Sequence, residues 1–252
     1  MSSPFTKKLP YKDLPKSMLL ESLGTLALVV LAASTAIGSY LLKGMDPFKE
    51  HALIAVTVAI VVGLSTLLFG SVSGAHINPS VSLAHAISGV IPRRMLVPFF
   101  GGQIAAAVVS AAVLRVAFGS INSPTHFGLT KIQEGATPTT GLLLEIIGTF
   151  VLSCVALYSS MSLKGKPEKQ AILSGVTIFV LTVLIGPFTG ASFNPSRSLG
   201  PALASGIFEN QVVYWVGPLT GAALAGSVFL LLENKRAKKK KAIMDIPEEI
   251  KL

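Results

Sequence analysis

Six long apolar stretches constrain the fold of this chain more than any other feature of its sequence. Each is about 20 residues long, the length of helix that crosses a hydrocarbon layer of about 30 Å. Within lipid, backbone polar groups must pair internally, which a single segment achieves as an α-helix. Only 13% of the residues are charged, about half of the roughly 25% found in soluble domains. The sequence therefore predicts an all-α membrane protein with six transmembrane helices, near 17–42, 52–70, 95–118, 141–162, 171–187 and 212–232.

The basic residues indicate how these spans are oriented. Most of the 21 Lys and Arg residues lie in residues 1–16, 71–94, 163–170 and 235–252. These segments fall on one side of a six-span topology, and the side rich in Lys and Arg faces the cytoplasm. We therefore expect both termini in the cytoplasm and the protein in the cell membrane.

The same distribution decides what the net charge of +9 means. The charge is concentrated beside the spans, where anionic lipid head groups are the nearest partner, so we expect membrane lipid and no nucleic acid. The chain then divides into a cytoplasmic segment at 1–16, a membrane domain at 17–234 and a basic cytoplasmic tail at 235–252.

The membrane domain contains an internal repeat. Glu21-Ser-Leu-Gly-Thr in the first span recurs from Glu145 as Glu-Ile-Ile-Gly-Thr, and the segment 73–80 recurs at 189–196. Each half holds three spans, an odd number, so the second copy enters the membrane from the opposite side. We therefore expect inverted repeats at about 17–118 and 141–234, joined by a crossover segment at 119–140.

Both copies of the repeat contain Asn-Pro-Ser followed by about ten apolar residues. Ten helical residues rise only about 15 Å, so each stretch crosses half a membrane. Asn is a strong N-cap and Pro fits the first helical position. The pattern therefore predicts two re-entrant half-helices whose positive dipole ends meet at the membrane midplane, capped by Asn78 and Asn194 and beginning with Pro79, Ser80, Pro195 and Ser196.

The two Asn-Pro-Ser segments carry a resemblance to a known family. Ser-Gly-Ala-His-Ile-Asn-Pro-Ser at 73–80 and Gly-Ala-Ser-Phe-Asn-Pro-Ser-Arg-Ser-Leu-Gly-Pro at 190–201 resemble the two pore loops of the aquaporin, or major intrinsic protein, family. The likeness extends from about Glu21 to Leu232, and Ser80 and Ser196 replace the Ala that is usual there. It implies a right-handed bundle of six tilted helices and two half-helices, assembled as a homotetramer with one pore in each subunit.

The resemblance also implies roles for single residues. Glu21 and Glu145 would hold the pore loops, the alternative being a proton relay. Arg197 would place a fixed positive charge in the outer constriction, the alternative being an arginine that snorkels to the membrane interface. Spacing from the two Asn residues aligns the family's four-residue selectivity filter with Val58, Thr182, Ala191 and Arg197.

The predicted filter and other positions of the sequence favour different permeating molecules. Strict water channels of the family usually have an aromatic residue and His at the positions of Val58 and Thr182, so this filter is predicted to be wide and non-aromatic. Ser198, Ala202 and the pair Tyr214-Trp215 instead resemble the water branch. We therefore expect a passive channel for water and small neutral solutes such as glycerol, urea, ammonia or hydrogen peroxide, which excludes ions because dehydrating them is costly.

Parts of the sequence also motivate other hypotheses. His76 lies just before Asn78, a position that motivates the hypothesis of a pH gate. A solute-selective facilitator of the same fold is the nearest alternative function, and an ion-coupled secondary transporter, which also uses inverted repeats, is the more distant one. We expect no enzyme activity, cofactor or metal, because the sequence shows neither a nucleophile with a base partner nor a cluster at metal-ligand spacing.

Overall fold

The computed structural model describes residues 13–42, 46–121 and 124–244. Within these ranges the chain is entirely helical apart from its connections, and six helices are long and apolar enough to cross a membrane. The prediction of six spans is therefore confirmed. The long helices are α1 (Leu14–Leu41), α2 (Pro47–Phe69), α4 (Leu96–Phe118), α5 (Pro138–Ser162), α6 (Pro167–Thr189) and α8 (Gln211–Met244).

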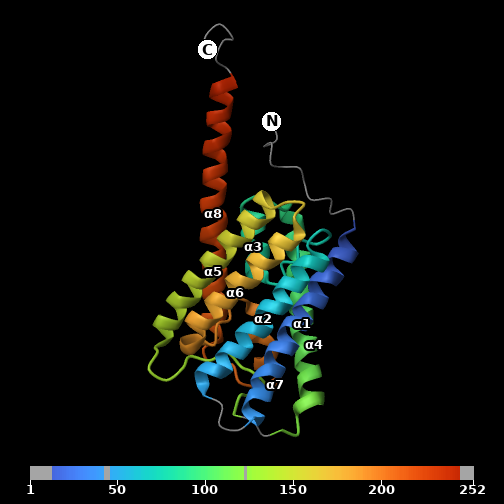
Figure 1. Cartoon of the computed structure of the whole chain (residues 1–252), viewed down its shortest axis with the longest axis vertical. Helices are drawn as coiled ribbons and strands as arrows, with labels where there is room; N and C mark the ends of the chain where they lie inside the picture. The colour runs from blue at the N-terminus through green and yellow to red at the C-terminus, as the bar shows by residue number, and fades with distance from the viewer. Residues whose placement is uncertain (1–12, 43–45, 122–123, 245–252) are drawn as a thin grey trace.

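The two expected half-helices are α3 (Pro79–Ile87) and α7 (Pro195–Ser205), with a 3-10 turn, η1 (Arg93–Met95), after the first. The order long, long, short, long thus occurs twice along the chain. The pairing of helices follows the same symmetry, because α1 packs on α4 as α5 packs on α8, while α2 and α6 pack across the two halves. This is the inverted-repeat bundle that the sequence predicts (Figure 1).

Several helices start or end outside the apolar stretches that revealed them. Helix α2 begins at Pro47, ahead of the predicted 52, because Asp46 caps it through a hydrogen bond from the Phe48 amide. Helix α5 begins at Pro138, inside the segment expected to be crossover, because Thr137 caps it through the Thr140 amide. Hydropathy marks the part of a helix that lies in lipid, whereas caps set where the helix itself begins.

The last helix shows the largest difference. The apolar stretch ends near residue 232, but α8 continues to Met244 and extends past the rest of the bundle (Figure 1). The part of the predicted basic tail that the structure describes is therefore a continuation of this helix. Lys and Arg are good helix formers, so the charge run does not terminate it.

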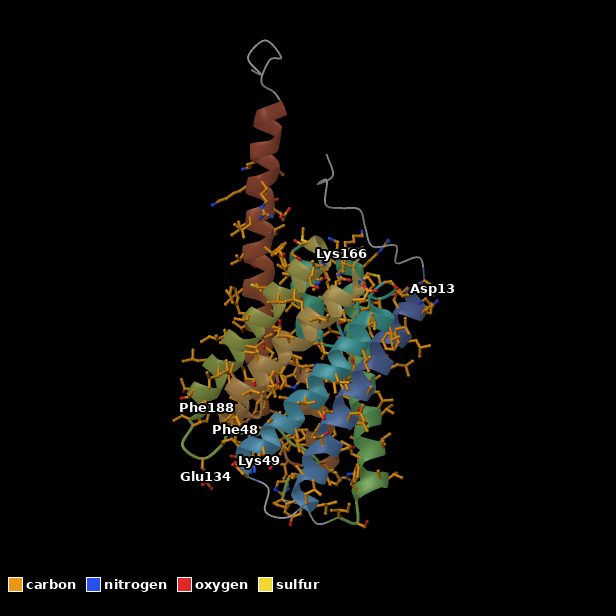
Figure 2. All side chains as sticks on the ribbon, in the orientation of Figure 1. Asp13, Phe48, Lys49, Glu134, Lys166 and Phe188 are labelled. Atoms are coloured by element: carbon orange, nitrogen blue, oxygen red, sulfur yellow. The ribbon has the colours of Figure 1, made fainter. Side chains whose placement is uncertain are left out.

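Side chains on the flanks of the bundle are apolar, and charged side chains gather at its ends. Leu31 and Val116 are among the exposed apolar residues, as expected of a surface that faces lipid. Figure 2 shows Asp13 and Lys166 toward the end from which α8 projects, and Lys49 toward the opposite end.

Two equivalent glycines let the pore loops enter the bundle. A Cβ atom at Gly24 of α1 would collide with the side chain of Ile77, and one at Gly148 of α5 would collide with that of Phe193. Ile77 and Phe193 are the residues that precede the two capping Asn residues. Small residues at these positions therefore allow each loop to pack against the first helix of its own repeat.

Candidate functional site

The half-helices begin at the two Asn residues. The Asn78 side-chain oxygen accepts a hydrogen bond from the Ser80 amide at 2.8 Å. The Asn194 oxygen accepts one from the Ser196 amide at 3.0 Å and a longer one, 3.4 Å, from the Arg197 amide. Pro79 and Pro195 occupy the first helical positions. The side chains thus satisfy amides that have no partner within the helix.

The remaining amide group of each Asn reaches across to the other loop. Asn78 Nδ2 donates to the Phe193 carbonyl at 2.8 Å, and Asn194 Nδ2 donates to the Ile77 carbonyl at 3.0 Å. Ile77 and Phe193 have positive φ angles of 44° and 52°, an unfavourable backbone conformation for residues with side chains. The exchanged bonds stabilise this conformation and hold the N-termini of α3 and α7 against each other. Each side-chain amide has a second hydrogen that these bonds leave unused.

A buried carboxylate holds the first pore loop. Glu21 accepts hydrogen bonds from the backbone amides of His76, at 2.9 Å, and Ile77, and from Gln103 Nε2 at 2.9 Å. Gln103 Nε2 also lies 3.0 Å from Ser82 Oγ on α3. The carboxylate thereby holds the loop through two backbone amides, and Gln103 links the carboxylate to the half-helix α3.

The second carboxylate repeats the arrangement with different partners. Glu145 accepts hydrogen bonds from the amides of Ser192, at 3.0 Å, and Phe193, at 2.7 Å, and from the Thr189 hydroxyl at 2.8 Å. Tyr214 on α8 donates to the Thr189 carbonyl at 2.9 Å. Neither carboxylate is among the residues that line the cavity described next. Their contacts favour a structural role over a proton relay.

A cavity of about 330 Å³ runs past both Asn side chains. We call it the pore cavity. Its walls contain apolar residues of α1, α2 and α5, such as Leu28, Val62 and Leu152, while polar residues come from the two pore loops, the half-helices, the end of α5 and α6. Its polar lining includes His76, Asn78, His85, Ser159, Ser160, Lys164, Gln170, Ser174, Thr177, Asn194 and Arg197. The lining therefore presents separate hydrogen-bonding groups within a partly apolar wall.

The predicted filter is only partly assembled around this cavity. Val58, Ala191 and Arg197 line it, whereas Thr182 is buried but absent from the lining. The Thr182 hydroxyl has no hydrogen-bond partner among the described residues. Arg197 is 6% exposed, and its Nη1 donates to the Gly128 carbonyl at 2.8 Å. The arginine therefore lies inside the protein and does not snorkel along its surface.

The crossover segment forms part of this site, which the sequence did not indicate. Besides binding Arg197 through Gly128, it is linked to the second loop by a chain of hydroxyl groups. Thr130 Oγ1 lies 2.6 Å from Ser198 Oγ, which lies 2.6 Å from Ser192 Oγ. Ser192 Oγ donates to the Asn194 carbonyl at 2.9 Å. Since each hydroxyl donates one hydrogen, the bonds run in one direction from Thr130 to the pore loop.

The two histidines near the first loop are in ring contact. The ring centroids of His76 and His85 are 4.3 Å apart with the planes tilted by 36°, and the rings of His76 and Phe99 form a T-shaped contact with centroids 5.5 Å apart. His76 Nδ1 lies 3.1 Å from Ser82 Oγ, and His85 Nε2 lies 2.9 Å from Ser160 Oγ. The structure thus places His76 in the pore lining, where a gate would have to be. No group of three metal-ligating side chains occurs in the part of the chain that the structure describes.

Comparison with known proteins identifies the family. The sequence model of the major intrinsic proteins matches residues 8–229. The chain belongs to the major intrinsic protein family. Within this family, Aquaporin TIP4-1 of Zea mays is 34% identical over 217 residues, which cover 82% of this chain and 83% of the relative. Putative aquaporin NIP4-1 of Arabidopsis thaliana is 32% identical over 219 residues, covering 87% and 75%.

A solved structure shares the architecture. The X-ray structure of the aquaglyceroporin from Plasmodium falciparum superposes with a TM-score of 0.74 at 22% identity, covering 88% of this chain and 96% of that one. The similarity confirms the fold, including the re-entrant half-helices α3 and α7. As a major intrinsic protein the chain is a passive channel for water or small solutes and not an enzyme.

Proposed function

We propose that the protein conducts water together with small neutral solutes, such as glycerol, urea, ammonia or hydrogen peroxide. The observation that carries this proposal is the composition of the outer part of the pore cavity. Val58 and Ala191 line it beside Arg197, and neither side chain is large. Along the cavity, a solute that both donates and accepts hydrogen bonds meets Arg197 and the two Asn amides, while its apolar part faces Val58 and Leu28.

We further propose that ions and protons are excluded. A small ion stripped of water in an apolar bore loses hydration worth tens of kcal/mol unless the wall replaces it. The polar lining supplies scattered single groups in place of a coordination shell. The facing N-termini of α3 and α7 and the Arg197 guanidinium oppose cations. The two Asn amides would bind a passing water through its oxygen and interrupt a proton-conducting chain of waters.

The solute range is tested by stopped-flow light scattering on proteoliposomes, first under an impermeant osmolyte and then under glycerol and urea gradients. We expect rapid shrinkage in the first case and rapid solute entry in the second. Val58→Phe narrows the outer pore, so it should retain much of the water flux and lose glycerol and urea entry. Val56→Phe on the lipid-exposed side of the same helix is the matched control. Wild-type protein that passes water and no solute would contradict the proposal.

Thr182 needs a separate test, because it is buried outside the cavity lining. If it reaches the pore during permeation, Thr182→His should restrict solutes as Val58→Phe does. If only Val58→Phe restricts them, the functional filter consists of Val58, Ala191 and Arg197. These outcomes distinguish a four-residue filter from the three-residue lining seen here.

Two alternative functions predict different fluxes. A solute-selective facilitator would raise solute permeability above that of empty liposomes by a larger factor than it raises water permeability. An ion-coupled transporter would show saturable uptake that stops when a sodium or proton gradient is dissipated. We expect neither, since solute entry should rise linearly with concentration and should not respond to ionophores.

We also propose a homotetramer in the cell membrane with both termini in the cytoplasm. The tetramer is supported by membership of the family. The apolar flanks of the bundle and the exposed basic residues at the end that carries α8 support the membrane location and the orientation. Native mass spectrometry in detergent should give four times the mass of 26.3 kDa. A protease added to intact cells should leave tags at both termini uncut and remove them only after permeabilisation.

A further inference from the structure

The start of α6 lines a part of the pore cavity that the predicted filter does not include. Gln170, Ser174 and Thr177 belong to the first three turns of α6 and line the cavity. Their spacing of four and three residues places them on one face of the helix. Figure 2 shows Lys166, just before α6, toward the end from which α8 projects, and Phe188 toward the opposite end. We call the half of the cavity beside the start of α6 the inner half.

Two threonines of the inner half can only accept hydrogen bonds from a solute. Thr177 Oγ1 donates its hydrogen to the Leu173 carbonyl at 2.7 Å, and Thr66 Oγ1 on α2 donates to the Val62 carbonyl at 2.8 Å. Both threonines line the cavity. Since a hydroxyl group has one hydrogen, each of these oxygens presents only lone pairs to a solute.

Ser160 on α5 is a third acceptor, because His85 determines the direction of its hydrogen bond. His85 Nδ1 lies 2.8 Å from the Val81 carbonyl, which can only accept, so this nitrogen carries the hydrogen of the neutral ring. His85 is buried beside the ring of His76, which disfavours a charged form. Nε2 therefore accepts, and Ser160 Oγ donates to it at 2.9 Å. Both side chains line the cavity, and the serine oxygen keeps its lone pairs for a solute.

These acceptors lie at different depths. Thr66 and Ser160 are within one turn of the ends of α2 and α5, whereas Thr177 is about 15 Å along α6, so a solute meets them in succession. The other two polar side chains on this face of α6 can act in either sense. The Ser174 hydroxyl has no hydrogen-bond partner within the described ranges, and the amide of Gln170 contains both a donor and an acceptor atom.

The polarity of the inner half differs from that of the region around the capping asparagines. Asn78, Asn194 and Arg197 carry N–H groups, which bind the oxygen atoms of a solute. Lys164 also lines the cavity, but it is exposed in the connection between α5 and α6, at the mouth. A solute that crosses the inner half therefore replaces its hydrogen bonds to water best when it has several N–H or O–H groups that point in different directions.

We propose that the inner half of the pore selects, among small neutral solutes, those that donate hydrogen bonds in several directions, with urea as the preferred solute. Thr66, Ser160 and Thr177 are the specificity-determining residues. Urea donates through two amino groups on different sides of its carbonyl carbon, and its single oxygen suits the N–H groups of the two asparagines and Arg197. The proposal rests on the solute permeation proposed above and adds which solutes the pore favours.

The first test compares the entry of urea and acetamide into proteoliposomes by stopped-flow light scattering. Acetamide has nearly the shape of urea, but a methyl group replaces one amino group, so it donates from one side only. Thr66→Val and Thr177→Val keep the shape of the side chain and remove the acceptor. Each should lower the ratio of urea to acetamide permeability by about threefold, and the double variant should lower it further. The ratio does not depend on how many pores are folded.

The matched control is Thr139→Val, the same substitution at an exposed position of α5 outside the cavity lining, which should leave the ratio unchanged. A double variant that keeps the wild-type ratio would overturn the proposal, whether the two fluxes stay the same or fall together.

A second measurement does not require that solutes pass the filter. Urea or acetamide is present at equal concentration on both sides of the membrane, and an impermeant osmolyte drives water out. Urea held in the inner half should slow wild-type water flux more than acetamide does, and Thr66→Val/Thr177→Val should abolish this difference. Equal slowing by the two solutes in the wild type would refute selection in the inner half. Wild-type protein that passes water and neither solute would refute the solute range proposed above, and this measurement would then decide the role of the inner half.

Discussion

Asn78 Nδ2 donates a hydrogen bond to the carbonyl of Phe193, the residue that precedes Asn194, and Asn194 returns an equivalent bond to the carbonyl of Ile77. The two pore loops are therefore joined at the point where their half-helices meet. Each Asn caps its own helix with its oxygen and braces the opposite loop with one amide hydrogen. The second amide hydrogen can then be offered to a permeating molecule without disturbing either loop.

Asn78→Ala removes the cap, the brace and the pore donor together. Loss of the cap should lower the free energy of unfolding by about 1–2 kcal/mol. Loss of a water hydrogen bond of about 1 kcal/mol should slow permeation about fivefold. Thermal unfolding in detergent and stopped-flow shrinkage measure the two effects. Asn234→Ala, on an exposed part of α8, is the control and should change neither.

Glu145→Gln tests whether the buried carboxylate holds the second loop. Gln has nearly the same shape, but one of its terminal atoms is a donor and would face amide donors of Ser192 or Phe193. We expect a loss of about 2–3 kcal/mol in stability and a matching loss of folded yield, since hydrogen bonds to charged groups are strong. The control is Glu209→Gln at an exposed position. A proton relay would instead show a folded variant with altered proton flux.

Arg197→Val should make the channel leaky to cations. A unit charge that acts on a cation about 8 Å away contributes about 2 kcal/mol at an effective dielectric of about 20, which corresponds to a change in leak of about thirtyfold. Proton flux into liposomes containing a pH-sensitive dye measures this. The matched control is Arg236→Val, far from the pore. If proton leak stays at the wild-type level, exclusion depends on the half-helices alone.

The hypothesis of a pH gate at His76 predicts a sigmoidal change in permeability with pH. The contacts of His76 favour the opposite outcome. Its Nδ1 is engaged by Ser82, and its ring lies between His85 and Phe99, so a positive charge there would be buried beside a second titratable ring. We expect flat water permeability between pH 5.5 and 8 in the wild type and in His76→Ala. A pH response that His76→Ala abolishes would establish the gate.

The features of this protein that depend on residues close together in the sequence could be predicted from the sequence. Hydropathy locates spans because each helix meets lipid along its own length, and Asn-Pro marks a helix start because capping involves residues within three positions. The contacts of Glu21 with the loop were expected through the family resemblance. They could not be derived from spacing alone, since His76 lies 55 residues away.

Other features depend on contacts that no local pattern encodes. Gln103 binds Glu21 across 82 residues, and its only signal in the sequence is an amide side chain within an apolar span. The position of Thr182 relative to the cavity depends on the rotation of α6 about its axis, which spacing from Asn194 does not determine. The crossover segment lacked any periodic pattern, so its attachment to the second loop was not anticipated.

That attachment supports the last prediction. Thr130, Ser198 and Ser192 form one chain of hydrogen bonds ending on the Asn194 carbonyl, so Thr130→Val and Ser198→Ala each break the same chain. We expect each single variant to lose about 1 kcal/mol of stability, and the double variant to lose clearly less than the sum.

The crossover also supplies the Gly128 carbonyl to Arg197, at 2.8 Å. Loosening it through Thr130→Val should therefore raise glycerol entry relative to water, because Arg197 is held less firmly at the outer pore. Ser120→Ala, at an exposed position of the same crossover segment, is the control for a general effect of the connection. Additive stability losses together with an unchanged ratio of glycerol to water flux would mean that the crossover merely covers the pore and does not position its arginine.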